Sequence, residues 1–273
     1  MAAEPLFDTH VHLDLLPDDW SLEEEVNLAR RAGVDRFLLP GVHPSGWPRL
    51  LATAREIAGA WAAPGVHPLA AECWDRDTSL QLERLLGHER VAAIGEIGLD
   101  ALPGMPAAAR QEKVLRAQLQ MARAAGKPVV LHCRKATGRL LTLLKEEGAY
   151  HYGGIWHGFS GSPETARAAM DLGFALACGG PLTWPGARRG PETLQALPAE
   201  WIVLESDAPD LAPHPHRGQP NHPVWLPLIA ARVADLRGWS LAETARITTA
   251  NALRVLKIRL KADKADRRLK PED

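Results

Sequence analysis

The stretch F-D-T-H-V-H-L-D, from Phe7 to Asp14, joins an apolar run to two histidines that are separated by one residue. A run of this composition is typical of a β-strand, and residues i and i+2 of a strand point to the same face. We therefore expect His10 and His12 to project side by side near one end of a strand. An isolated His-x-His pair is often only two polar strand-end side chains, so its meaning depends on the rest of the chain.

The same pattern of a short apolar run followed by polar residues recurs along the chain, with segments of helical pattern between the runs. The expected strands are Leu6–His12, Arg36–Gly41, Trp61–Val66, Val91–Ile97, Pro128–His132, Gly154–His157, Phe174–Cys178 and Trp201–Glu205. Ser21 and Ser240, each with a Glu three residues later, indicate helix starts, and Arg110–Ala125 is the clearest amphipathic helix. Eight strands alternating with helices over about 250 residues predict an α/β fold of the (β/α)8, or TIM, barrel type. An open doubly wound sheet is the alternative, but the absence of an early G-x-G-x-x-G argues against its dinucleotide-binding form.

Size and composition fit one large domain. The chain has 273 residues, 46% of them hydrophobic, so we expect a single barrel over residues 1–258 and a charged, disordered tail over 259–273. The formal net charge of −1 provides no general basic field, so a nucleic-acid substrate would need a local groove or metal ions. Three widely spaced cysteines, no signal-peptide pattern and no membrane-length apolar run favour a cytoplasmic protein.

Catalytic groups of a (β/α)8 barrel lie where strands end and the following loops begin. At these positions the sequence carries four imidazoles and two carboxylates: His10, His12, Glu96, His132, His157 and Asp207. Mixed nitrogen and oxygen donors suit zinc or manganese, and also magnesium at a carboxylate-rich position. Because six ligands exceed the three or four of a single zinc site, we expect two divalent ions about 3.5–4 Å apart.

The order of the strands predicts how the two ions are shared. Glu96 is central in that order and is the natural bridge between the ions. His10, His12 and Asp207 come from the first and last strands, which are neighbours in a closed barrel, so they should hold one ion. The other two histidines come from the neighbouring fifth and sixth strands and should hold the second ion. Glu205 lies on the same strand face as Asp207 and could support the site from behind.

Three further residues near the expected strand ends could contact a substrate. His67 could contact a phosphate or a leaving group, and it could equally be a structural strand-end residue. Arg134 could neutralise a substrate oxygen or pair with a carboxylate such as Asp100. Asp100 is expected beside the substrate or behind a metal ligand that it orients. Strand alternation places Cys133 on the face opposite the neighbouring histidine, so it should pack against helices instead of binding metal.

With these residues assembled, the chain resembles the TatD family of metal-dependent hydrolases and deoxyribonucleases. The matching motifs follow the family's order from about Leu6 to about Leu256: D-T-H-V-H, G-V-H-P, G-E-I-G-L-D, R-Q-x₃-L-x₂-Q-L with H-C-R, H-G-F-S-G, E-S-D-A-P and N-A-L-R. H-G-F-S-G-S, C-G-G-P-L-T-W-P and S-D-A-P-D-L are most similar to the YjjV-type branch. The resemblance implies a TIM barrel of the metal-dependent hydrolase type and a two-metal site whose ligands match all six residues.

The loops expected around the site bear on substrate choice. A-L-P-G-M-P follows Asp100 without the aromatic residues that many relatives carry there, and His222 stands where many members have Glu. Both departures lie in loops after strands, so they concern the substrate more than the metals. Trp74 and Trp184 fall in such loops too, where an indole could stack on a nucleic-acid base.

The resemblance implies metal-assisted hydrolysis of phosphodiester bonds, most directly by a 3′–5′ exonuclease acting on single-stranded DNA. Asp207 would accept the proton of the attacking water, and Glu96 would bridge the two divalent ions. We expect DNA as the substrate, no membrane association, a monomer or weak homo-oligomer, and no obligate protein partner. The same barrel could instead hydrolyse a non-phosphate ester, lactone or amide. A non-catalytic binding barrel is the third alternative, against which the presence of both carboxylates argues.

Overall fold

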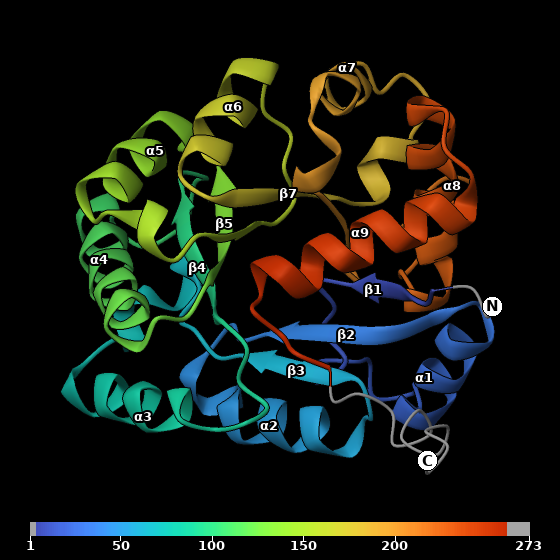
Figure 1. The fold of residues 1–273 in the computed structure, drawn as a ribbon. Coiled ribbons are helices and arrows are strands. Elements are labelled where there is room, and N and C mark those ends of the chain that lie inside the picture. Colours follow the sequence, from blue (N-terminus) through green and yellow to red (C-terminus); the bar gives the residue numbers. More distant parts are fainter. Residues whose placement is uncertain (1–3, 261–273) are drawn as a thin grey trace, which may run out of the picture.

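Eight strands alternate with helices in the computed structural model, which describes residues 4–260. The strands are β1 (Leu6–Asp8), β2 (Val34–Pro40), β3 (Ala60–Ala63), β4 (Ile94–Asp100), β5 (Val129–Arg134), β6 (Gly154–Trp156), β7 (Phe174–Cys178) and β8 (Ile202–Leu204). The α-helices are α1 (Leu22–Arg31), α2 (Trp47–Glu56), α3 (Arg76–Leu86), α4 (Ala108–Ala125), α5 (Thr137–Glu146), α6 (Pro163–Asp171), α7 (Arg189–Ala196), α8 (Leu226–Arg237) and α9 (Leu241–Val255). Figure 1 shows the helices arranged around the strands. The charged tail expected over 259–273 lies outside the described residues from position 261 onward.

The strands close on themselves. β1 to β3 form one parallel ladder and β4 to β8 form another. Backbone hydrogen bonds join the ladders at both edges: Thr9, just after β1, donates to the carbonyl of Leu204 in β8, and Ala92, just before β4, donates to the carbonyl of Ala62 in β3, both at 2.9 Å. This closure confirms the predicted TIM barrel and excludes an open doubly wound sheet. None of the described helices is both long and apolar enough to cross a membrane.

The barrel interior is packed with apolar side chains and is covered at one end by α9. Val130, Ile155 and Val203 belong to a buried cluster that includes Ala252 of α9. Asn251 of α9 donates to the carbonyl of Ile202 at 2.9 Å, so this helix lies at the end where the strands begin. Side chains two residues further along a strand share its face. On the inner face, the next side chains toward the other end of the barrel are His132, His157 and Glu205.

Two strand boundaries differ from the prediction in ways that matter for the site. β1 ends at Asp8, so the expectation that His10 and His12 lie on a strand is wrong. The chain turns there toward the loop after β8: Asp207 N–H donates to the carbonyl of His10, and His12 N–H donates to the carbonyl of Ala208, both at 2.9 Å. β4 extends to Asp100, so Glu96 lies inside the strand instead of at its end.

The predicted helix ends are close to those observed. Ser21 Oγ accepts a hydrogen bond from the N–H of Glu24 at 3.4 Å, and Ser240 Oγ accepts one from Glu243 at 3.1 Å, as N-cap residues do. The amphipathic helix expected from residue 110 begins two residues earlier, as α4. It ends at Ala125, and the capping residue Gly126 has a φ of 62°, a left-handed conformation that glycine adopts without steric cost.

Candidate metal centre

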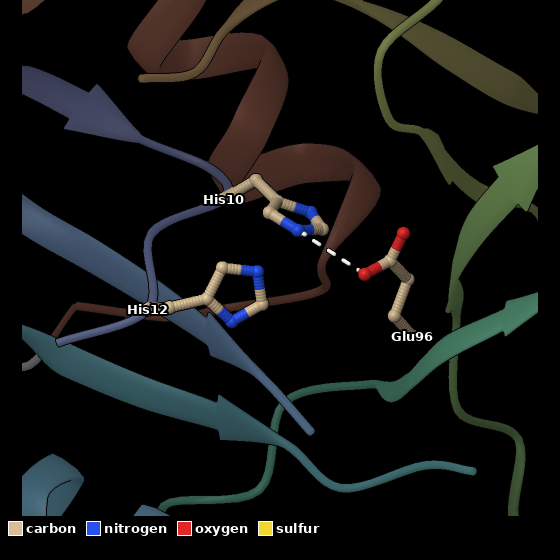
Figure 2. A group of neighbouring side chains, drawn as sticks. All are labelled: His10, His12 and Glu96. Carbon is tan, nitrogen blue, oxygen red and sulfur yellow. Dashed lines mark ion pairs between the residues drawn. The ribbon is translucent and has the colours of Figure 1, made fainter. Parts of the chain in front are cut away.

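The six residues predicted as metal ligands lie together at the end of the barrel opposite α9, four of them buried and two, His132 and His157, partly buried. Three Nε2 atoms surround Asp207 Oδ1, at 3.7 Å for His10, 3.9 Å for His12 and 3.8 Å for His157. Glu96 lies beside them, with its Oε2 3.4 Å from His10 Nε2. Figure 2 shows the imidazole of His10 aimed at the Glu96 carboxylate, with His12 next to both. The sixth residue, His132, places Nδ1 2.8 Å from Glu96 Oε1.

Close backbone packing fixes the position of Glu96. A Cβ atom on the preceding residue, Gly95, would lie 2.6 Å from Cβ of Val130 in β5, so no larger side chain fits there without a shift. On the other side, a Cβ on Gly65 would lie 2.8 Å from the Gly95 Cα. Glu96 N–H donates to the carbonyl of Gly41 at 2.8 Å. The carboxylate is therefore held by three neighbouring segments of the barrel wall.

Glu96 belongs to two groups of side chains with the spacing of metal ligands. One contains His10 and His12, and the other contains His67 and His132. This arrangement fits a bridging carboxylate, but the second group pairs His132 with His67 instead of His157. The ring of His157 stacks on His10 instead, with centroids 3.5 Å apart and planes inclined by 21°.

His10 and His12 are neutral imidazoles with unsatisfied nitrogens. Burial lowers the pKa of His10, and it lowers the pKa of His12 to about 3. Among the described residues, neither nitrogen of His10 has a hydrogen-bond partner, and Nδ1 of His12 has none. Buried polar atoms without partners cost free energy, and a neutral imidazole offers a lone pair to a cation. The chemistry of this donor set therefore fits a divalent metal ion.

His132 and His157 are each oriented by a carboxylate on the nitrogen that faces away from Glu96. Asp100 Oδ2 lies 3.1 Å from His132 Nε2, and Glu205 Oε2 lies 2.8 Å from His157 Nδ1. Carboxylates behind imidazoles are typical of metal sites, where they fix the ring and raise the basicity of the coordinating nitrogen. This contact pattern gives Asp100 and Glu205 the geometry of positioning residues, with His132 Nδ1 and His157 Nε2 turned toward the centre.

The charged groups of the centre shift one another's pKa values. Burial opposes the imidazolium of His157, but the surrounding carboxylates, Glu205 first among them, outweigh burial and hold its pKa well above the ordinary value. Burial also opposes ionised Glu96, but the charges and hydrogen bonds of the surrounding histidines outweigh burial and hold the pKa of Glu96 well below the usual range. For Asp207, burial prevails and raises its pKa well above the ordinary value. The centre without metal therefore favours a proton on His157 and another on Asp207.

The backbone around Asp207 is unusual and firmly held. Asp207 has a φ of 61°, a left-handed conformation that is uncommon outside glycine and is stabilised only by its surroundings. The N–H of the preceding residue, Ser206, donates to Asp8 Oδ1 at 2.8 Å. Burial raises the pKa of Asp8 to about 7. Asp8 thus ties β1 to the loop after β8, a role that sequence reasoning missed although the residue begins the D-T-H-V-H motif.

His67 lies inside the centre with a defined tautomer. Its Nδ1 accepts a hydrogen bond from the N–H of Leu69 at 3.1 Å, so the proton of the neutral ring is on Nε2. Burial lowers the pKa of His67 to about 4, which keeps the ring neutral. Nε2 lies 3.9 Å from Glu96 Oε1. A protonated Nε2 donates hydrogen bonds and does not coordinate metal, so this geometry favours contact with a substrate oxygen.

Two glutamines of α4 hold the strand ends beside the centre, and sequence reasoning from spacing did not assign them. Gln118 accepts from the N–H of Val66 at 2.8 Å and donates to its carbonyl at 3.1 Å, one residue before His67. Gln111 forms the same pair of bonds with the backbone of Asp100, at 2.8 and 2.9 Å. Both are buried. Their spacing of seven residues places them on one helix face, which was the signal available in the sequence.

A cavity of about 1300 Å³ opens from the centre, and several of the remaining predicted residues line it. Arg134 is exposed and lines this cavity, as expected for a substrate contact. Trp184 also lines it, but Trp74 is 9% exposed and packs in the core, so it is not available for stacking on a base. Cys133 packs against the hydrophobic core, with Sγ 3.8 Å from Thr137 Oγ1, and it also borders the cavity.

Comparison with known proteins gives a consistent picture. Residues 7–257 match the family model described as TatD related DNase. An uncharacterized metal-dependent hydrolase, YabD of Bacillus subtilis, is 37% identical over 93% of this chain and 99% of its own length. The 3′-5′ ssDNA/RNA exonuclease TatD of Cronobacter sakazakii is 36% identical over 92% of this chain and 97% of its own length. The crystal structure of YjjV, a TatD homologue from Escherichia coli, superposes with a TM-score of 0.87 at 32% identity, covering 93% of this chain and 98% of YjjV.

Proposed function

Because this chain belongs to the TatD family of metal-dependent hydrolases, we propose that it is a deoxyribonuclease that shortens single-stranded DNA from the 3′ end. The observation that carries the proposal is the Glu96 carboxylate, which has an imidazole beside each oxygen at the base of a large cavity: His10 Nε2 lies 3.4 Å from Oε2, and His132 Nδ1 lies 2.8 Å from Oε1. Such a shared carboxylate suits a pair of ions that clamp a phosphodiester. A relative named as an exonuclease on single-stranded DNA and RNA supports the choice of substrate.

We assign the ligands as the strand order predicts, with two divalent cations of zinc, manganese or magnesium. His10, His12 and Asp207 would hold one ion, and Glu96 would bridge to the second. The second ion would also be held by the two histidines that carboxylates orient, His132 through Nδ1 and His157 through Nε2. When bound, the ions supply positive charge that polarises a phosphoryl oxygen and acidifies a water.

The protein's own groups would then position the substrate and move the proton. Asp207 Oδ1 faces three imidazoles, which leaves its other oxygen to accept the proton of the attacking water as general base. His67 Nε2–H and the Arg134 guanidinium would donate to the phosphate oxygens. Glu205 and Asp100 would hold the histidine rings.

The test uses chelator-treated protein reloaded with Mg²⁺, Mn²⁺ or Zn²⁺ and incubated with 5′-labelled single-stranded DNA. We expect a metal-dependent ladder that shortens from the 3′ end. The Asp207→Ala variant, which removes the proposed base, should produce no ladder. A panel of carboxylic esters and lactones is assayed in parallel.

The outcomes separate the alternatives. A ladder that persists in Asp207→Ala would contradict the role of this residue. No cleavage of DNA with any metal, together with turnover of an ester or lactone, would replace the nuclease by another hydrolase of the same barrel. No turnover of any substrate by protein that binds metal would favour a binding barrel.

A further inference from the structure

The cavity extends well beyond the candidate metal centre, toward the segment that joins β7 to α7. Its wall there includes Trp184 and Arg188 of that segment, Arg189 at the start of α7, and Arg217 of the loop after β8. Pockets for small molecules measure roughly 300–1,000 Å³. At about 1300 Å³, this cavity is larger than one reacting group requires. Its outer part therefore has room for a ligand that continues past the centre.

The three arginines of this outer wall are exposed cations, and none of them forms an ion pair with a carboxylate of the part of the chain that the structure describes. In residues 4–260, the arginines that form ion pairs are others, such as Arg116 with Glu146 and Arg139 with Glu112. The acidic side chains of the same cavity are mostly those of the centre itself. Unpaired guanidiniums on a cavity wall fit an anionic ligand, and their planar donors match phosphate oxygens.

One of these arginines, Arg217, is held in place by Trp184, and we call this pair the Trp184–Arg217 platform. The Arg217 Cζ atom lies 4.3 Å from the centroid of the Trp184 ring, a cation–π contact. Trp184 Nε1 donates to the carbonyl of Ala212 at 2.9 Å, which fixes the indole against the loop after β8. Stacking on the indole leaves the in-plane N–H groups of the guanidinium free to donate. The platform thus presents a held cation to the cavity.

Apolar side chains complete the cavity mouth. Leu15, Leu69 and Leu211 are 46%, 50% and 42% exposed and line the same cavity as the arginines. Large aliphatic side chains at the mouth of a polar site suit a ligand with apolar faces as well as charge. A single strand, whose bases are free to leave the stack, combines a phosphate chain with such faces. A folded duplex hides its bases and matches this mouth less well.

We propose that Arg188, Arg189 and the Trp184–Arg217 platform form an outer subsite that binds the phosphodiester backbone of the nucleotides on the 5′ side of the scissile bond. This inference rests on the proposed function, in which the 3′-terminal phosphodiester lies at the metal centre and the rest of the strand leaves the centre in the 5′ direction. The subsite accounts for binding of a polyanion by a chain that has no general basic field.

The proposal is tested with two charge-removing variants of the full-length, metal-loaded protein, Arg217→Gln and the double variant Arg188→Gln/Arg189→Gln. The control is Arg246→Gln, because Arg246 is exposed on α9, at the far end of the barrel. Binding of fluorescently labelled dT12 is measured by anisotropy over a range of salt concentrations. Hydrolysis of dT12 and of bis(p-nitrophenyl) phosphate, which cannot reach the outer wall, is measured with the same preparations.

We expect each subsite variant to weaken dT12 binding about fivefold to tenfold per arginine and to raise KM for dT12 with little change in kcat. The slope of log Kd against log salt should fall by about 0.7 for each lost phosphate contact. Hydrolysis of bis(p-nitrophenyl) phosphate should match that of the unmodified protein, and the control should behave normally throughout.

Three outcomes are informative in different ways. Unchanged dT12 binding and salt slope in both subsite variants would overturn the subsite. Equal losses with dT12 and with the small diester would also overturn it, since they would indicate damage to the centre. A weakened binding of dT12 without hydrolysis of any phosphodiester would support the subsite as a polyanion site and reject the nuclease function.

Discussion

Glu205 and Asp100 each divide their two oxygens between a histidine and the backbone. Glu205 Oε1 accepts from the N–H of Gly158 at 2.8 Å while Oε2 faces His157. Asp100 Oδ1 accepts from Leu102 N–H at 2.9 Å while Oδ2 faces His132. The backbone contact removes the rotational freedom of each carboxylate, so each ring is held in one orientation before any ion arrives. At the scale of residues, this preorganisation is the main structural support of the proposed metal centre.

We predict that Glu205→Gln lowers metal affinity by about 10- to 100-fold, the usual effect of removing a carboxylate behind a coordinating histidine. The substitution keeps the size of the side chain but loses the charge that favours a basic His157. Asp210→Asn is the matched control, because Asp210 is exposed and lines the same cavity without touching a histidine ring. Competition with a chromophoric chelator measures the affinity. Equal affinities of the two variants would show that the Glu205 contact is unimportant.

Metal binding at pH 7 should release protons. The raised pKa values of His157 and Asp207 mean that the metal-free centre holds protons that an ion must displace, whereas His10 and His12 are already neutral. Because protons compete with the metal, its affinity should fall as the pH is lowered. Calorimetric titrations in two buffers should give different apparent binding enthalpies. The difference, divided by the difference between the ionisation enthalpies of the two buffers, should correspond to at least one released proton per protein. Identical heats would contradict the assigned protonation states.

At the scale of elements, α4 links the ends of two strands to the site. Gln118 binds the peptide group of Val66 after β3, and Gln111 binds that of Asp100 at the end of β4. Arg110, at the start of the same helix, donates to the carbonyl of Ala71 in the loop after β3 at 3.0 Å. A single helix therefore sets the backbone on which His67 and Asp100 are carried.

We predict that Gln118→Leu destabilises the protein by about 2–3 kcal/mol, because it leaves both the N–H and the carbonyl of Val66 buried without partners. Gln120→Leu, on the exposed side of the same helix, should change stability by less than about 0.5 kcal/mol. Urea unfolding of both variants measures the difference in the free energy of unfolding. The m-value, which is the slope of this free energy against urea concentration, should be the same in both variants and in the unmodified protein. A loss of stability in Gln118→Leu no larger than in Gln120→Leu would contradict the role given to this contact.

The elements of the barrel were predictable because their signals are local. The alternation of apolar runs with capped helices located every strand, and β7 has the predicted bounds, Phe174–Cys178. β1 ends earlier than predicted because, beyond Asp8, its backbone pairs with the loop after β8, which is nearly two hundred residues away. No local pattern encodes that pairing. The seven-residue spacing of Gln111 and Gln118 places both on one helix face, but it does not reveal which backbone groups of other elements they bind.

The residues of the proposed centre come together because the barrel closes. Residue types and strand order predicted that these six side chains converge, since the carboxyl ends of parallel strands meet at one end of a barrel, and the structure brings them together. Their distances and protonation states were not predictable, because these depend on the burial produced by the whole fold. His67 is an example: only the contact from Leu69 N–H identifies it as a donor. At the scale of the whole molecule, the site therefore forms only because the eight strands close into a barrel.

Closure also means that an ion at this centre would tie together segments far apart in the sequence, from His10 just after the first strand to Asp207 just after the last strand. Binding to the folded state alone stabilises it by about 2.7 kcal/mol at a free metal concentration one hundred times Kd. For a domain of this size that corresponds to a rise in Tm of about 5–10 °C. We therefore predict that chelation lowers Tm by this amount and that Mn²⁺ or Zn²⁺ restores it.

Asp207→Ala separates this effect from general salt stabilisation. Without Asp207 the first ion loses its carboxylate, so the variant should show a much smaller rise in Tm at the same metal concentration. Its Tm without metal should equal or exceed that of the unmodified protein, because a buried carboxyl with a strongly raised pKa is itself unfavourable in the fold when ionised. Differential scanning calorimetry of both proteins, with and without metal, measures all four values. A rise in Tm of equal size in both would place the stabilising ion elsewhere on the molecule.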